Sequence, residues 1–141
     1  MAENAAETRV TVMSAMRYQD APAAIEWLCN AFGFDKHLVV PDGNGGIAHA
    51  ELTFGNGMVM LGSWRDDAYG KVTRTPRMLD GANTASIYVV VADTDVHYRR
   101  AIAAGAKIFM DIVDNDYGGR GYSCFDLKGY VWSFGSFDPW K

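Results

Sequence analysis

An internal repeat constrains the fold of this chain more than any other feature. Residues 45–63, GGIAHAELTFGNGMVMLGS, superimpose without a gap on residues 118–136, GGRGYSCFDLKGYVWSFGS, and both segments begin Gly-Gly and end Gly-Ser. The offset is 73 residues, and it also carries Asp20 onto Asp93, each of which precedes a helical pattern. Two copies of one unit predict a cleft between them, where ligand sites tend to form.

Length and composition predict one globular domain over residues 1–141. The chain is 49% hydrophobic and 21% charged, which is close to the globular average, and it has no apolar run of membrane-spanning length. The net charge of −4, without a cluster of Lys or Arg, argues against nucleic-acid or membrane partners and permits a cationic ligand. The polar N-terminal segment MAENAAETR does not resemble a signal peptide, so we expect a cytoplasmic protein.

The hydrophobic periodicity predicts the same order of elements in both halves. The first half has a strand at 9–18, a helix from Asp20 to Gly33, a strand at 37–40 and a hairpin joined at Asn56-Gly57. The second half has a strand at 86–91, a helix that starts at Asp93 or Asp95, a strand at 107–112 and a closing hairpin. Each half is therefore βαβββ, with module one at 9–63, a linker at 64–85 and module two at 86–137.

These patterns, with the segments YQDAPAAIEWLCNAFGF, HAEL, AIAAGAKI and DxxYGGRGYxxxDLKGYVW, resemble the vicinal oxygen chelate superfamily. That superfamily includes glyoxalase I, extradiol dioxygenases and bleomycin-resistance proteins, and the chain is most similar to its glyoxalase-like, bleomycin-resistance-like members. The resemblance implies an α+β fold in which two tandem βαβββ modules form a curved mixed sheet around a cleft, with the helices on the outer face. It also implies a homodimer, with the cleft either within one chain or across the dimer.

Catalytic members of the superfamily hold a divalent metal with one ligand from the first and one from the last strand of each module. The matching positions here are Met13, Met60, Ser86 and Ser133, and the two pairs are each 73 residues apart. A thioether or a neutral hydroxyl is a poor ligand for a hard divalent cation, which prefers carboxylate or imidazole. We therefore expect no metal at this site and no other cofactor.

Strand alternation predicts which side chains line the cleft. In module one it places His49 and Glu51 on the face of Met60, where they form a polar anchor, an acid–base pair or two metal ligands. In module two it places Tyr88, Tyr122, Cys124, Val131 and Ser133 toward the cleft, with Phe125, Trp132 and Phe134 toward the helices.

Residues outside these two faces allow more than one interpretation. Trp64 and Tyr69 are aromatic residues in a polar linker, so they stack on a ligand or pack on a second subunit. Arg120, with Asp114 and Asp116, holds a polar ligand group or braces the glycine loop. The remaining histidines, His37 and His97, are interpreted as surface residues.

Three classes of function remain open. The first is a metal-free, homodimeric protein of the bleomycin-resistance type that sequesters a planar or cationic drug or metabolite. Its expected ligand-binding residues are His49, Glu51, Met60, Trp64, Tyr88, Arg120, Tyr122 and Ser133. The second is a lyase, isomerase or dioxygenase that uses Glu51 and His49 as acid and base, or a displaced metal held by His49, Glu51 and Cys124. The third is an interaction protein without a ligand.

Overall fold

The computed structural model describes residues 4–141. Residues 1–3, the start of the segment on which the expected cytoplasmic location depends, lie outside the described residues. Module one contains β1 (Ser14–Tyr18), α1 (Ala21–Phe32), β2 (Asp35–Pro41), β3 (Ile47–Phe54) and β4 (Gly57–Ser63). Module two contains β5 (Ile87–Val90), α2 (Thr94–Ala103), β6 (Lys107–Asp114), β7 (Arg120–Phe125) and β8 (Val131–Gly135), and a short 3-10 helix, η1 (Pro76–Leu79), lies in the linker.

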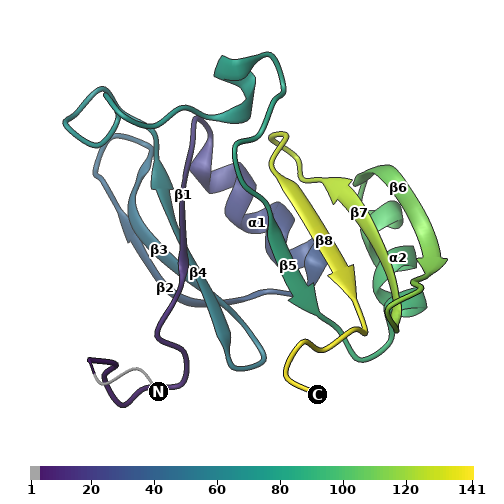
Figure 1. Cartoon of the computed structure of the whole chain (residues 1–141). Coiled ribbons are helices and arrows are strands. Elements are labelled where there is room, and N and C mark those ends of the chain that lie inside the picture. Colours follow the sequence, from purple (N-terminus) through teal and green to yellow (C-terminus); the bar gives the residue numbers. More distant parts are fainter. Residues whose placement is uncertain (1–3) are drawn as a thin grey trace.

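The predicted α+β fold of two βαβββ modules is confirmed. Each module forms one four-stranded mixed sheet, in the orders β1-β4-β3-β2 and β5-β8-β7-β6. The first strand of each module runs parallel to the last, and the other neighbours are antiparallel. Figure 1 shows the two sheets side by side, with the edge strands β1 and β5 next to each other and both helices behind the strands.

Local signals for the helix ends are confirmed. The Asp20 carboxylate accepts a hydrogen bond from the Ala23 amide at 3.3 Å, and Asp93 accepts one from the Val96 amide at 3.1 Å. Pro22 lies in the first turn of α1, and Gly33 ends the helix with a φ of 86°, a left-handed conformation that glycine adopts without strain. Side chains close in sequence therefore determine these boundaries.

The first strand is shorter than the predicted span of 9–18. It begins at Ser14, which is level with Val59, so residues before Val12 would be level with the hairpin loop and have no strand to pair with. The hairpin itself turns at Gly55-Asn56, because Phe54 pairs with Gly57. The predicted turn at Asn56-Gly57 was wrong by one residue, which moves the pairing by two positions and leaves every side chain on its predicted face.

The gapless superposition fails in the third strand of module two. Leu52 pairs with Val59, seven residues on, whereas Cys124 pairs with Trp132, eight residues on. One additional residue in the β7–β8 connection therefore changes the offset from 73 to 72, and a one-residue shift exchanges the two faces of a strand. Contrary to prediction, Tyr122 and Cys124 face the helices, whereas Ser123 and Phe125 lie on the open face with Tyr88 and Ser133.

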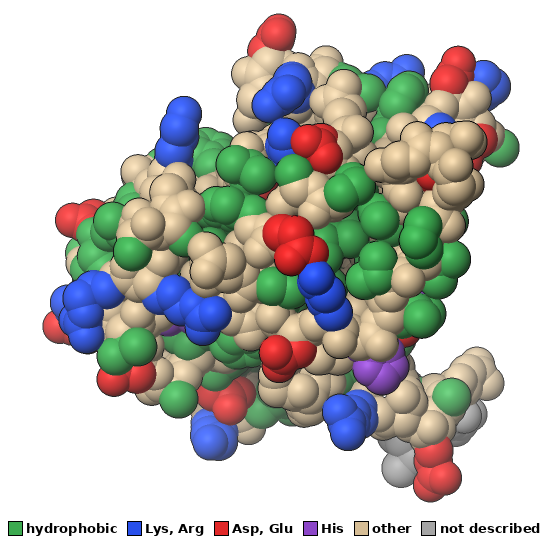
Figure 2. All heavy atoms as spheres, turned by 180° about the vertical axis from the view of Figure 1, so that it is seen from behind, with side chains coloured by type: hydrophobic (Ala, Val, Ile, Leu, Met, Phe, Trp, Pro, Cys, Tyr) green, Lys and Arg blue, Asp and Glu red, His purple; other side chains and the backbone are tan. Residues whose placement is uncertain are grey.

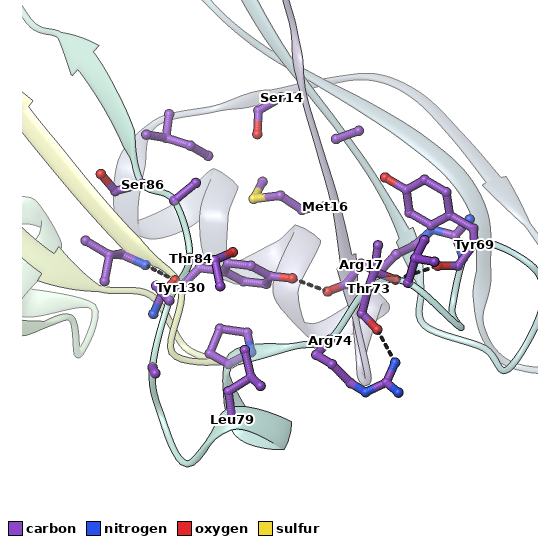
Figure 3. Close-up of a pocket in the computed structure, with 18 residues that line it drawn as sticks. Ser14, Met16, Arg17, Tyr69, Thr73, Arg74, Leu79, Thr84, Ser86 and Tyr130 are labelled. Carbon is purple, nitrogen blue, oxygen red and sulfur yellow. Dashed lines mark hydrogen bonds between the residues drawn. The ribbon is translucent and has the colours of Figure 1, made fainter.

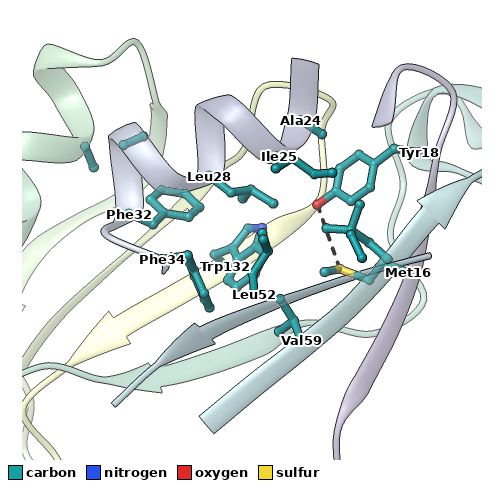
Figure 4. Packing of buried hydrophobic residues seen from close by; sticks show 14 of the residues in the cluster. Met16, Tyr18, Ala24, Ile25, Leu28, Phe32, Phe34, Leu52, Val59 and Trp132 are labelled. Carbon is teal, nitrogen blue, oxygen red and sulfur yellow. Dashed lines mark hydrogen bonds between the residues drawn. The ribbon is translucent and has the colours of Figure 1, made fainter. Parts of the chain in front are cut away.

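One hydrophobic core joins the two modules. Figure 4 shows α1 packing Leu28 and Phe32 against strand side chains that include Leu52 and Trp132. Phe32 and Trp132 are fully buried, with ring centroids 5.3 Å apart, although they belong to different modules. The helix of module one therefore packs on the sheets of both modules, and apolar burial of this kind is the main favourable term in folding.

His97 forms a second connection between the modules and is buried, contrary to its interpretation as a surface residue. Its Nε2 lies 2.8 Å from the Phe32 carbonyl oxygen and its Nδ1 lies 2.6 Å from the Tyr122 hydroxyl. Because a carbonyl only accepts, Nε2 carries the proton and Nδ1 accepts from Tyr122. Burial lowers the pKa of His97 from its ordinary value, so the imidazole is neutral in the folded chain.

This neutral imidazole predicts a loss of stability in acid. The unfolded chain binds a proton at His97 near pH 6.5, whereas the folded chain binds it only at lower pH. The free energy of unfolding should therefore decrease as the pH falls from 7 to 5, by at most about 1.4 kcal/mol per pH unit from this residue. Urea unfolding of the wild type and His97→Gln checks this. Equal pH slopes would refute it, and His37→Gln, a change at an exposed histidine, is the control.

The outer face that carries the helices has a mixed surface. Figure 2 shows acidic and basic side chains scattered over this face, with hydrophobic groups between them. Among residues 4–141 no helix has the length and apolar character needed to cross a membrane.

Candidate functional site

The two sheets leave a continuous series of side chains on the face opposite the helices. Ala15 of β1 pairs with Met60 of β4, which pairs with Glu51 of β3. In the other module, Tyr88 of β5 pairs with Ser133 of β8, which pairs with Ser123 of β7. Because β1 and β5 are adjacent edge strands, these two rows meet at the boundary between the modules.

A cavity of about 430 Å³ lies at this boundary, and we call it the seam pocket. It is bordered by β1, by the start of β5, by the linker and by the end of the β7–β8 connection. Its apolar lining comprises Ala15, Met16, Val72, Pro76, Leu79, Ala82, Ala85, Ile87 and Val131. Its polar lining comprises Ser14, Arg17, Tyr69, Thr73, Arg74, Asn83, Thr84, Ser86 and Tyr130. A cavity of this size, with apolar surface and polar groups that can orient a ligand, is typical of small-molecule sites.

Hydrogen bonds across the boundary fix the centre of the seam pocket. The Tyr130 hydroxyl donates to the Arg17 carbonyl oxygen at 2.7 Å, so a side chain of module two is bonded to β1 of module one (Figure 3). Burial raises the pKa of Tyr130 to about 12, so this hydroxyl keeps its proton. The Asn83 amide donates to the Gly129 carbonyl oxygen at 2.9 Å and accepts from the Val131 amide at 3.1 Å. The linker is therefore bonded to module two where it borders the pocket.

His49 and Glu51 lie on the same open face but outside the seam pocket. Their side chains are 2.8 Å apart, from Nε2 to Oε2, and His37 Nε2 lies 3.9 Å from the other Glu51 oxygen. The predicted pairing of His49 with Glu51 is present. Within residues 4–141, however, no three His, Cys, Asp or Glu side chains are arranged to hold a metal ion.

The positions that hold metal in the resembled family do not suit a metal here. Met60 offers only a thioether, and the Ser133 hydroxyl is 2.6 Å from the Ser123 hydroxyl, with which it shares a hydrogen bond. Met13 and Ser86 lie just before β1 and β5. This donor set has neither carboxylate nor imidazole, so it does not fit a divalent cation.

Four candidate site residues lie away from the open face or the pocket. Tyr122 is buried under α2, and Arg120 lies 3.2 Å from Asp95 of α2 and 3.3 Å from Asp114, so it braces the loop. Trp64 donates its indole N–H to the Thr73 carbonyl oxygen at 3.2 Å and so holds the linker. Cys124 is fully buried on the helix side of β7, whereas His49 and Glu51 lie on the open face of the other module, so the three side chains cannot share a metal ion.

Sequence reasoning missed most residues of the seam pocket. Arg17, Arg74 and Tyr130 were not singled out, because the linker has no periodicity and the pocket forms only when the modules pack. One signal was available: Tyr69 and the polar linker around it were identified as unusual for a solvent-exposed connection. Long connections of this kind are often functional.

Comparison with known proteins gives the same family at the levels of sequence and structure. The profile of the Glyoxalase/Bleomycin resistance protein/Dioxygenase superfamily matches residues 10–134. The uncharacterized protein Rv0887c of Mycobacterium tuberculosis (strain H37Rv) is 32% identical over 116 residues, which cover 82% of this chain and 68% of that protein. The crystal structure of TioX from Micromonospora sp. ML1 is 32% identical, with a TM-score of 0.70, and the match covers 89% of this chain and 94% of TioX. Lactoylglutathione lyase from Agrobacterium tumefaciens, at 17% identity and a TM-score of 0.60 over 92% of this chain and 95% of that one, shares the fold.

Proposed function

Because the chain belongs to the glyoxalase/bleomycin resistance protein/dioxygenase superfamily, we propose that it is a metal-free protein that sequesters a small molecule in the seam pocket. The observation that carries this proposal is the 430 Å³ cavity at the boundary of the modules. It lies beside family metal positions that offer only thioethers and hydroxyls, so the chain has the means to hold a ligand without the usual means to transform it.

The side chains that line the cavity agree with the expectation of a planar ligand. Tyr69 and Tyr130 border the cavity, and tyrosine rings present flat apolar surfaces to aromatic groups. The cationic part of that expectation depends on Glu51, which lies two strands from β1 and does not line the cavity.

In this proposal the protein acts in the cytoplasm as a homodimer. The open faces of both sheets carry exposed apolar side chains, among them Leu38 and Val40 of β2 and Met110 and Val113 of β6. A second copy that covered these strands would remove that apolar surface from water. Sedimentation equilibrium checks the dimer, and a monomer at all accessible concentrations would exclude it.

A cavity-filling variant tests the pocket directly. Ala85 lines the seam pocket from the linker and is exposed, so Ala85→Trp should fill the cavity without disturbing the core and should weaken binding of any captured compound at least about tenfold. Native mass spectrometry of freshly purified protein identifies the compound, and calorimetry measures its affinity. Ala103→Trp, at the exposed end of α2, is the matched control; equal affinities of the two variants would reject the pocket.

A second candidate function is supported by the 2.8 Å contact between His49 and Glu51. Glu51 lies in the row that leads through Met60 to Ala15 at the pocket, and a His–Glu pair of this kind supports general acid–base chemistry. Glu51→Gln distinguishes the two functions. Under sequestration the affinity for the ligand stays within about twofold, whereas under catalysis turnover falls by about 10²-fold or more.

A further inference from the structure

The charge of the seam pocket is opposite to the charge of the chain. The chain carries a net charge of −4, yet the charged residues that line the pocket are Arg17 and Arg74. Resting on the proposed function of this pocket, we propose that it takes a planar ligand that bears an anionic group, such as a carboxylate or sulfonate. A guanidinium recognises such groups with charge-assisted hydrogen bonds.

Arg17 contributes more to the shape of the pocket than to its positive charge. Its guanidinium carbon lies 4.6 Å from the centroid of the Tyr69 ring, and its Nη1 donates to the Ser63 carbonyl oxygen at 3.2 Å. The Asp67 carboxylate lies 3.9 Å away and offsets part of its charge. Arg17 therefore holds the Tyr69 ring in place at the border of the pocket, where the ring offers a flat surface.

Arg74 supplies the positive charge that is not offset. Its Nη1 donates to the carbonyl oxygens of Gly70 at 2.8 Å and Thr73 at 2.7 Å, which fixes the side chain. Within residues 4–141 no salt bridge includes Arg74. Hydrogen bonds to neutral carbonyl oxygens do not compensate the charge of the Arg74 guanidinium. An anionic group of a ligand would therefore be able to form an ion pair with it.

The positions of the lining side chains define the orientation in which the ligand would bind. Figure 3 shows Arg74 and Leu79 at one end of the pocket, Ser14 and Ser86 at the other, and Met16 and Tyr130 between them. The ligand that fits has its anionic group at the Arg74 end and its planar apolar part against Met16 and Tyr130. Its far end carries a group that hydrogen-bonds with the serine hydroxyls.

A pair of fluorescent dyes with one ring system separates charge from shape. 8-Anilinonaphthalene-1-sulfonate is anionic, and N-phenyl-1-naphthylamine is the same scaffold without the sulfonate. We expect the wild type to bind the sulfonate dye about five- to tenfold more tightly than the neutral dye. This difference in affinity should decrease as the salt concentration rises. Ala85→Trp should abolish binding of both dyes, which assigns the signal to the seam pocket.

Two arginine variants with equal changes in net charge complete the test. Arg74→Met should remove the advantage of the sulfonate dye and leave the neutral dye unchanged. Arg77→Met should change neither, because Arg77 lies in η1 but does not line the seam pocket; it lines a second cavity of about 590 Å³. Both residues are exposed, and the melting temperature of each variant checks that it is folded.

Each other outcome overturns the inference in a recognisable way. Equal or tighter binding of the neutral dye, or of the planar cation proflavine, refutes an anionic ligand while the proposed sequestration stands. Loss of the sulfonate advantage in Arg77→Met as much as in Arg74→Met shows that the net charge of the protein, not Arg74, causes it. Absence of any binding that Ala85→Trp removes rejects the proposed function together with this inference.

Discussion

Replacing Asp126 with alanine should lower the free energy of unfolding by about 3–4 kcal/mol. The Asp126 carboxylate is buried and accepts four hydrogen bonds: from the Tyr18 hydroxyl at 2.6 Å, the Trp132 indole at 3.0 Å, and the amides of Lys128 and Tyr130 at 2.9 and 3.0 Å. Tyr18 belongs to module one and Trp132 to module two. Alanine would leave these donors buried without an acceptor, and each such donor is costly.

Asp126→Asn tests the effect of replacing only one of the two carboxylate oxygens. Oδ2 accepts from both Tyr18 and Trp132, so an amide nitrogen in its place would face the Trp132 N–H, which cannot accept. We expect a loss of about 1–3 kcal/mol, smaller than that of the alanine variant. Urea unfolding of both variants checks the order. Asp116→Ala, at an exposed aspartate, is the control. If Asp126→Ala lowered the free energy of unfolding as little as Asp116→Ala does, water would be replacing the carboxylate as the acceptor.

Phe32→Ala should destabilise the chain by a similar amount, about 3–5 kcal/mol. Phe32 is the last residue of α1 and is fully buried, and its ring lies 4.6 Å from Phe134 and 5.3 Å from Trp132, between ring centroids. Truncation would leave a cavity where the helix of module one packs on the sheet of module two. A loss of this size is a large part of the roughly 5–15 kcal/mol that stabilises a typical domain.

The matched control is Phe109→Ala. Phe109 also contacts another aromatic ring, that of Phe125 at 4.8 Å, but it is 45% exposed, so its truncation should cost less than about 1 kcal/mol. Denaturant unfolding followed by tryptophan fluorescence reports on both variants, since Trp132 lies beside Phe32. If the two variants lost equal stability, the packing of α1 across both modules would not be a main source of stability.

The parts of the fold that were predicted correctly depend on neighbours in sequence. Asp20, Asp93 and Gly33 act within one turn of their helices, so their positions in the chain are sufficient to locate the helix ends. The order of elements likewise follows from hydrophobic periodicity, which needs no knowledge of distant contacts.

The parts that were predicted wrongly depend on contacts between distant segments. The face of Tyr122 is determined by its pairing with Phe134, and that pairing depends on the exact number of residues between β7 and β8. His97 is buried because α2 lies against Phe32, 65 residues away in sequence. Thr94, His97 and Ala101 recur at helical spacing and form the buried face of α2, so the spacing of these three residues is the sequence signal for the burial of His97.

Arg74 and Tyr130 show why the pocket was harder to find than the fold. Both line the seam pocket, but Arg74 belongs to an irregular linker and Tyr130 to a turn between strands. Neither segment has a period that predicts where its side chains point. Their proximity to β1 arises only from the packing of one module on the other, which is the least local of the interactions in this chain.

The additional residue between β7 and β8 changes which side chains a repeated unit presents on its open face. β6 and β7 follow the offset of 72 while β5 and β8 keep 73, so a different set of aligned positions reaches the open face and the other set turns toward the helices. In module one β3 presents His49 and Glu51, and in module two β7 presents Ser123 and Phe125. A difference of one residue in the length of a turn thus changes the chemistry of one half of the open face, and the same difference changes the side chains that this strand gives to the core.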